Sequence, residues 1–121
     1  MGEKGVTLSG GQKARLSLAR AVYCDADIYL LDDPISAVDS KVAREIFDKC
    51  IKQFKKTKII VLVTHQISFL YECCRVVIME NGGVIANDTP ENLKEKLAEI
   101  EESYEEDEID EEEKKIIEDL R

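Results

Sequence analysis

Two short apolar runs with an amphipathic helix between them restrict the fold of this chain more than any other feature. The first run covers Ile28–Leu31 and stops before Pro34, and the second, KIIVLV, ends at Val63. Between them, residues 40–54 repeat apolar side chains at helical spacing, and Asp39 is placed to cap that helix. Strand, helix and strand at this spacing predict a parallel βαβ unit, whose second strand is expected to be covered on both faces.

Further helices and a hairpin are predicted on either side of this unit. Residues 12–24 suggest a helix because they carry apolar residues at helical spacing, namely Ala14, Leu16, Leu18, Ala21 and Val22. A short helix is expected over residues 67–73, and residues 81–83 (Asn-Gly-Gly) join two apolar runs as in a β-hairpin. Thr89 and Pro90 suit the cap and first position of a last helix. We therefore predict an α/β fold with a partial parallel sheet, helices and a C-terminal β-hairpin.

Charge divides the chain near residue 98. Residues 99–121 hold 13 acidic and 3 basic residues (net −10), whereas residues 1–98 hold 13 acidic and 14 basic residues (net +1). The overall charge of −9 is thus a property of the tail, and no large basic patch favours nucleic acid as a partner. We expect one domain over residues 1–98, then an acidic tail or linker that is helical or disordered. Repulsion between its carboxylates favours disorder in isolation.

Cysteine usage and hydropathy exclude several classes of protein. The 4 cysteines show no C-x-x-C spacing and His65 is the only histidine, so free thiols in a reducing compartment are expected rather than a metal site or disulfides. The longest strongly apolar run, Ile59–Val63, is far shorter than the ~20 residues of a membrane-spanning helix. The amino terminus lacks the apolar region of a secretory signal. We expect no transmembrane segment.

The start of the first predicted helix suits an anion. Ser9 and Gln12 flank two glycines and match a capping box, in which each side chain satisfies a backbone N–H. The same helix end can bind phosphate, because its free N–H groups and partial positive charge favour anions and the glycines permit close approach. Capping and phosphate binding draw on the same donors, so both interpretations stay open.

Polar residues follow both predicted strands. Asp32 and Asp33 end the first strand, at the edge where open α/β sheets place their ligands. Neighbouring side chains on a strand point to opposite sides, so one carboxylate can face Mg²⁺ while the other faces a nucleophilic water. His65 follows the second strand, is mostly neutral at pH 7 and can donate one hydrogen bond. A solvated strand end and a structural histidine are the plainer alternatives.

Together these residues resemble the C-terminal half of the nucleotide-binding domain of ABC (ATP-binding cassette) transporters, a P-loop NTPase-like ATPase domain. LSGGQ at residues 8–12 is similar to the family signature, and IYLLDDP at 28–34 to its Walker B strand. SAVD at 36–39 is similar to the D-loop, and VTHQ at 63–66 to the switch-histidine segment. The resemblance covers about residues 5–98. With the acidic tail, it is closest to the first cassette of multidrug-resistance-associated (C-subfamily) exporters.

The resemblance implies a role for each of these residues. Domains of this family act as head-to-tail dimers around two ATP molecules, so the signature would meet the γ-phosphate of ATP held by a second nucleotide-binding domain, through Ser9, Gly10, Gly11 and Gln12. Asp32 would act on Mg²⁺ through water, and Asp33 stands at the position of the general base. His65 would touch the γ-phosphate, and Asp39 would communicate across the interface. The implied partners are that second domain and the transmembrane domains of an exporter, at the cytoplasmic face of a membrane.

Two departures from the family pattern modify this expectation. The 121 residues contain no GxxxxGK[ST] phosphate loop and no glutamine loop, so the isolated chain is expected to bind ATP poorly and to hydrolyse none, whereas a complete cassette would be an ATPase. Asp33 replaces the usual glutamate, which draws the carboxylate back by roughly 1.5 Å. Because a shift of about 1 Å can cost on the order of 10²-fold in rate, slow hydrolysis is expected. A non-enzymatic remnant or docking fragment, and a piece of a soluble ABC ATPase, are the alternatives.

Overall fold

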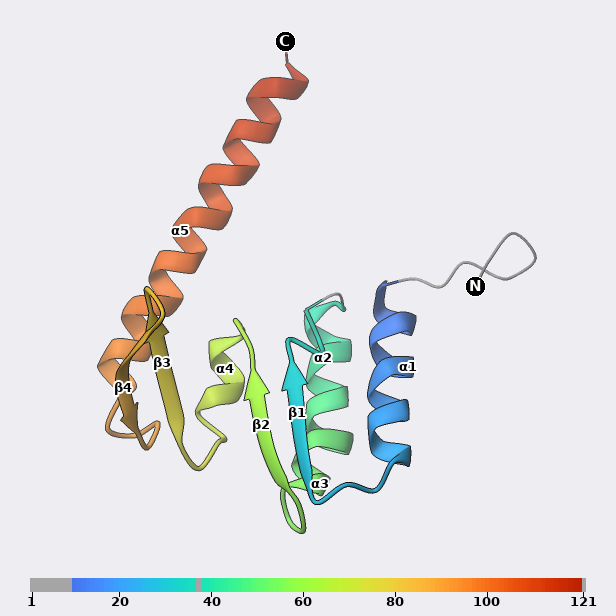
Figure 1. Ribbon diagram of the computed structural model, residues 1–121. Coiled ribbons are helices and arrows are strands. Elements are labelled where there is room, and N and C mark those ends of the chain that lie inside the picture. Colours follow the sequence, from blue (N-terminus) through green and yellow to red (C-terminus); the bar gives the residue numbers. More distant parts are fainter. Residues whose placement is uncertain (1–9, 37, 121) are drawn as a thin grey trace, which may run out of the picture. The chain divides into compact units, whose positions relative to one another are not determined.

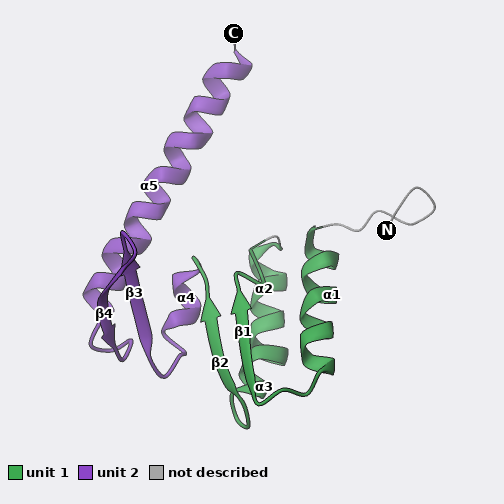
Figure 2. Cartoon of the chain, in the orientation of Figure 1, with its two compact units in different colours: residues 1–65 green, residues 66–121 purple. Residues whose placement is uncertain are grey.

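The chain divides into two compact units, which are described separately. The computed structural model describes residues 10–36 and 38–120 (Figure 1). Unit 1 covers Met1–His65 and unit 2 covers Gln66–Arg121 (Figure 2). Ser9, the first residue of the predicted capping box, lies outside the described residues.

Unit 1 contains the predicted strand–helix–strand arrangement. Its elements are α1 (Gly10–Tyr23), β1 (Ile28–Asp32), a long helix in three segments (α2, Ser40–Ile46; η1, Phe47–Ile51; α3, Lys52–Phe54) and β2 (Ile59–Val63). The two strands pair in parallel over their full length, from Ile28 opposite Ile59 to Asp32 opposite Val63. The ladder continues past the strand end, where the Asp33 N–H donates to the Val63 carbonyl at 2.8 Å. The parallel βαβ prediction is confirmed.

The long helix covers one face of this small sheet. The ring of Tyr29 on β1 lies 5.4 Å from the ring of Phe54 on α3, and Ala43, Phe47 and Ile51 are buried along the same helix. Asp39 caps the helix as predicted, because its Oδ1 accepts the Val42 N–H at 2.9 Å. In η1 the helix widens locally to a π-helix, which the apolar spacing did not indicate.

The opposite face of the sheet is open to solvent. Five aliphatic side chains of β1 and β2 on this face are each more than half exposed: Ile28, Leu30, Ile59, Val61 and Val63. The prediction that β2 is covered on both faces is therefore wrong for the described residues. The pattern of β-branched residues indicates a strand suited to a two-sided core, but among the described residues a helix covers only one side.

Unit 2 is a hairpin packed on the start of a long helix. Its elements are α4 (Ile67–Leu70), β3 (Val76–Glu80), β4 (Gly83–Asp88) and α5 (Lys94–Asp119). The strands are antiparallel, and Asn81 and Gly82 both have left-handed backbones (φ 50° and 79°), as a two-residue type I′ turn requires. The core is formed by buried residues from three elements with partly buried neighbours: Ile67, Val76, Leu97, Leu70, Ile78, Leu93 and Ile100. The hairpin prediction is confirmed.

The last helix starts later than predicted and runs further. A turn follows Pro90, and α5 begins at Lys94. The Asp88 carboxylate accepts hydrogen bonds from the Asn92 side chain (3.0 Å) and the Thr89 N–H (2.7 Å), and these lower the pKa of Asp88. The sequence allowed either helix or disorder for the acidic residues after 98. In the structure α5 continues through them as far as Asp119. No helix in the described part of the chain is long and apolar enough to span a membrane.

Candidate functional site

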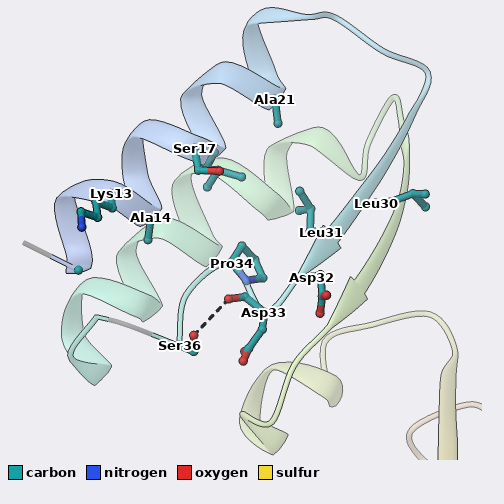
Figure 3. A pocket seen from close by; sticks show the side chains of 12 residues that line it. Lys13, Ala14, Ser17, Ala21, Leu30, Leu31, Asp32, Asp33, Pro34 and Ser36 are labelled. Atoms are coloured by element: carbon teal, nitrogen blue, oxygen red, sulfur yellow. Dashed lines mark hydrogen bonds between the residues drawn. The ribbon is translucent and has the colours of Figure 1, made fainter. Parts of the chain in front are cut away.

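A cavity of about 450 Å³ in unit 1 lies between α1 and the end of β1 (Figure 3). One wall consists of residues three or four positions apart on one side of α1, namely Gly10, Lys13, Ala14, Ser17, Leu18 and Ala21. The other wall is the end of β1 and the turn after it, namely Leu30, Leu31, Asp32, Asp33, Pro34 and Ser36. The cavity therefore brings one of the predicted signature residues together with both predicted aspartates.

The first turn of α1 contains three of the four residues predicted to bind an anion. Gly10 is the first residue of α1 and is exposed, Gly11 is half-buried, and Gln12 is exposed. Backbone N–H groups in the first turn of a helix have no partner within the helix and carry partial positive charge. The helix has no acidic residue in that turn, so its own side chains do not offset the charge.

Asp32 and Asp33 lie side by side in the chain but in different surroundings. Asp32 is the last residue of β1 and is exposed, whereas Asp33 is half-buried. Asp33 has a left-handed backbone (φ 47°), which is uncommon outside glycine and is tolerated best by asparagine and aspartate. Its carbonyl accepts a hydrogen bond from the Ser36 hydroxyl at 3.3 Å. The chain therefore leaves the extended conformation at Asp33, so strand alternation does not fix the direction of its side chain.

Charges are distributed unevenly along the two strands. Before β1, Asp25 and Asp27 lie 3.1 and 4.0 Å from the Lys58 ammonium, and the hydrogen bond to Asp25 raises the pKa of Lys58. At the other end, Asp32 and Asp33 have no ion-pair partner among the described residues. That end of the sheet therefore has the carboxylate oxygens that a divalent cation requires.

The donor set suits Mg²⁺ better than a transition metal. No group of three or more His, Cys, Asp or Glu side chains in the described part of the chain is placed to hold a metal ion. Mg²⁺ is commonly bound through one or two carboxylates, with waters and phosphate oxygens as its other ligands. Asp32 fits this requirement, directly or through water.

The remaining predicted residues, His65 and Asp39, follow β2 and cap α2 respectively, and neither lines the cavity. His65 is the second residue after β2 and is exposed. Asp39 is exposed, and its Oδ1 is occupied by the α2 cap. Gly11 lies against the segment that leads to Asp39, since a Cβ built on it would lie 3.1 Å from Cγ1 of Val38.

Three polar residues of the cavity wall were missed by sequence reasoning. Lys13 and Ser17 lie three and seven positions after Gly10, a helical spacing that places all three on one side of α1. Ser36 was noticed only as part of a motif, and its hydrogen bond to Asp33 has no signal in the sequence. The expected apolar stripe of α1 also needs correction, because Leu16 is 40% exposed whereas Leu18 is buried.

Comparison with known proteins gives a consistent result. The model of the family described as "ABC transporter" matches residues 1–36. Human "ATP-binding cassette sub-family C member 4" is 54% identical over 89 residues, which cover 74% of this chain. The Drosophila melanogaster "Probable multidrug resistance-associated protein lethal(2)03659" is 55% identical over 93 residues, or 77% of the chain. "ABC transporter C family member 2" of Dictyostelium discoideum is 49% identical over 96 residues, or 79%.

The chain is similar to C-subfamily ABC transporters. The family resemblance inferred from the motifs is thereby confirmed, and so is the α/β fold with a small parallel sheet and a hairpin. The aligned part spans only about 7% of the length of each of these three relatives. Activity, substrates and partners of the whole relatives are therefore considered below as proposals.

Proposed function

We propose that this chain forms part of the ATP-binding and hydrolysing domain of a C-subfamily ABC exporter and offers its signature to a second cassette. The proposal depends most on one observation. Asp32 ends β1 and Asp33 follows it, beside the end of the parallel strand β2, and His65 comes two residues after β2. Ligands of open α/β sheets bind at such carboxyl ends. The names of the relatives, which describe ATP-binding cassettes and transporters, agree with this proposal.

Each predicted residue has a part in this proposal. The signature residues Ser9, Gly10, Gly11 and Gln12 would donate backbone or side-chain hydrogen bonds to the γ-phosphate of ATP that the second cassette holds. Asp32 would orient Mg²⁺ through water, and Asp33 would act as general base on the attacking water. His65 would donate a hydrogen bond to the γ-phosphate in its own site.

Asp39 and the partners complete the proposal. The Asp39 oxygen that does not cap α2 would contact the second cassette, which associates head to tail. Transmembrane domains would couple this association to transport, with the cassette at the cytoplasmic face of the membrane. The chain alone should bind Mg-ATP weakly, because none of its 121 residues forms a GxxxxGK[ST] loop.

Nucleotide-dependent association tests the proposal directly. The 121-residue chain is mixed with the purified nucleotide-binding domain of human sub-family C member 4, and binding is measured by interferometry with Mg-ATP, with Mg-ADP and without nucleotide. We expect binding at least about tenfold tighter with Mg-ATP, since the signature end of α1 would contact the γ-phosphate, which ADP lacks.

Two glycine variants give the matched comparison. Gly10→Asp places a carboxylate at the proposed phosphate contact and should abolish the ATP-dependent part of binding. Gly83→Asp makes the same change in the hairpin, where a Cβ would meet only the Glu80 carbonyl at 3.7 Å, and should leave binding unchanged. Equal binding with ATP, ADP and no nucleotide would refute the proposal.

A further inference from the structure

Val38 lies where a side chain at Gly11 would be crowded. Gly11 is in the first turn of α1, and Val38 lies in the segment between β1 and α2. A Cβ added to Gly11 would lie 3.1 Å from Cγ1 and 3.9 Å from Cβ of Val38. Carbon atoms in good contact are about 3.5–4.0 Å apart, so a side chain at position 11 would require Val38 or the start of α1 to shift by a few tenths of an ångström.

Asp39, the residue after Val38, fixes the backbone at this point to the first turn of α2. Asp39 accepts the Val42 N–H with its side chain at 2.9 Å and the Ala43 N–H with its carbonyl at 2.8 Å. The backbone next to Val38 is therefore fixed to the first turn of α2. Because Val38 is half-buried and touches Gly11, its size controls how closely the start of α1 approaches this fixed backbone.

On the N-terminal side of Val38, hydrogen bonds connect the segment between β1 and α2 to the end of the sheet. The Ser36 hydroxyl donates to the Asp33 carbonyl at 3.3 Å, and the Asp33 N–H donates to Val63 on β2 at 2.8 Å. Val38 thus stands between the sheet end that bears the aspartates and the helix end that bears Gly10.

We propose that Val38 is a positioning residue, whose side chain sets the distance between the first turn of α1 and the segment that carries Asp39. This inference rests on the proposed function, in which the first turn of α1 contacts the ATP of a second cassette and Asp39 contacts that cassette itself. It also gives Gly11 a second reason to be glycine. Besides the approach of phosphate, a Cβ at this position would be crowded by Val38.

The contact itself is tested by unfolding, without any ligand. In the unaltered chain, Gly11→Ala should lower the unfolding temperature, because the new methyl group meets Val38. In the Val38→Ala background the same change should raise it, since alanine favours a helix over glycine once space is available. We expect shifts of roughly 2–5 °C in opposite directions. Equal shifts in both backgrounds would show that the two residues are not coupled, and would overturn the inference.

The functional role is tested in the association assay described above. Val38→Ala should weaken ATP-dependent binding about tenfold or more, because the loss of one hydrogen bond to the charged γ-phosphate costs on that order. Val38→Thr keeps the branched shape and should retain binding. Val42→Ala removes the same atoms from a half-buried valine on α2 and should also retain it. A general loss of stability would not distinguish the two alanine variants in this way.

The outcomes separate this inference from the proposed function. If the unaltered chain shows ATP-dependent binding and Val38→Ala binds equally well, the positioning role is wrong and the proposed function stands. If the unaltered chain shows no ATP-dependent binding, the proposed function fails and the positioning role fails with it. The unfolding comparison would then still report whether the two residues are in contact.

Discussion

Asp33 combines an unusual backbone with the position of a proposed catalytic base. Its left-handed φ of 47° is better tolerated by aspartate than by residues with longer side chains, and the Ser36 hydroxyl stabilises the turn through the Asp33 carbonyl. The shorter side chain thus suits the backbone, whereas under the proposed function it would hold the carboxylate further from the attacking water than a glutamate would. The left-handed backbone favours aspartate at this position, whereas the proposed role as general base would favour glutamate.

Replacement of Asp33 by glutamate measures how much ATPase rate is lost to the shorter side chain. In a C-subfamily transporter that carries this segment in place of its own, Asp33→Glu should raise the ATPase rate by on the order of 10-fold or more, because the carboxylate advances by about one bond length. Steady-state phosphate release is the measurement, and Asp33→Asn, which keeps the left-handed tendency without a base, should be inactive. An unchanged rate in Asp33→Glu would count against the assignment of the base.

At the scale of elements, α5 has one anchored part and one solvated part. Leu97 is fully buried against the hairpin and α4, and Ile100 packs at the edge of the same core. Beyond Tyr104 the helix carries a dense run of acids, and its remaining large apolar residues are more than half exposed: Ile109, Ile116, Ile117 and Leu120. The stability of unit 2 should therefore depend on the first two turns of α5 and hardly on its end.

Two leucine variants on α5 test this division. Leu97→Ala should destabilise unit 2 by about 2–5 kcal/mol, the usual cost of a cavity left by a buried leucine. Leu120→Ala changes a side chain that is 82% exposed and should cost no more than about 0.5 kcal/mol. Hydrogen exchange of the β3 and β4 amides reports the stability of this unit alone, and similar protection in the two variants would show that α5 is not anchored at Leu97.

The elements also show what the sequence could and could not predict. Asp39, the apolar spacing of residues 40–54 and the Asn-Gly turn each act locally, so the cap, the long helix and the hairpin were predictable. Asp32, Asp33 and His65 could be assigned to one sheet edge because parallel strands bring their carboxyl ends together. The approach of Gly11 to Val38 could not, since it depends on how segments distant in sequence meet. The left-handed Asp33 and its hydrogen bond from Ser36 are local, but the residue types of this turn do not specify a single backbone conformation. Whether the acidic residues after 98 form a helix could not be predicted either, because glutamate favours helix but repels neighbouring glutamates.

At the scale of the whole 121-residue chain, the open face of the parallel sheet is the main exposed apolar surface of unit 1. Its five aliphatic side chains lie in register across β1 and β2, with Leu30 opposite Val61. Parallel sheets are normally covered on both faces, and contiguous apolar patches promote association. We therefore expect the purified chain to self-associate through this face.

Two lysine variants distinguish this face from apolar exposure in general. Leu30→Lys puts a charge at the middle of the patch and should shift the chain towards monomer by severalfold in sedimentation velocity. Leu120→Lys alters a leucine of similar exposure (82% against 77%) on α5 and should not change self-association. If both variants sediment like the unaltered chain, the sheet face is not the contact.

The pairing of Lys58 with Asp25 and Asp27 has a consequence for what can approach the sheet. The Lys58 ammonium offsets one of the two negative charges near the start of the strands, whereas Asp32 and Asp33 at the other end have no ion-pair partner among the described residues. Net negative charge is therefore greater at the carboxyl ends of the strands than at their starts. A bare polyphosphate would be repelled there at short range, whereas the same polyphosphate accompanied by a dication would be drawn in.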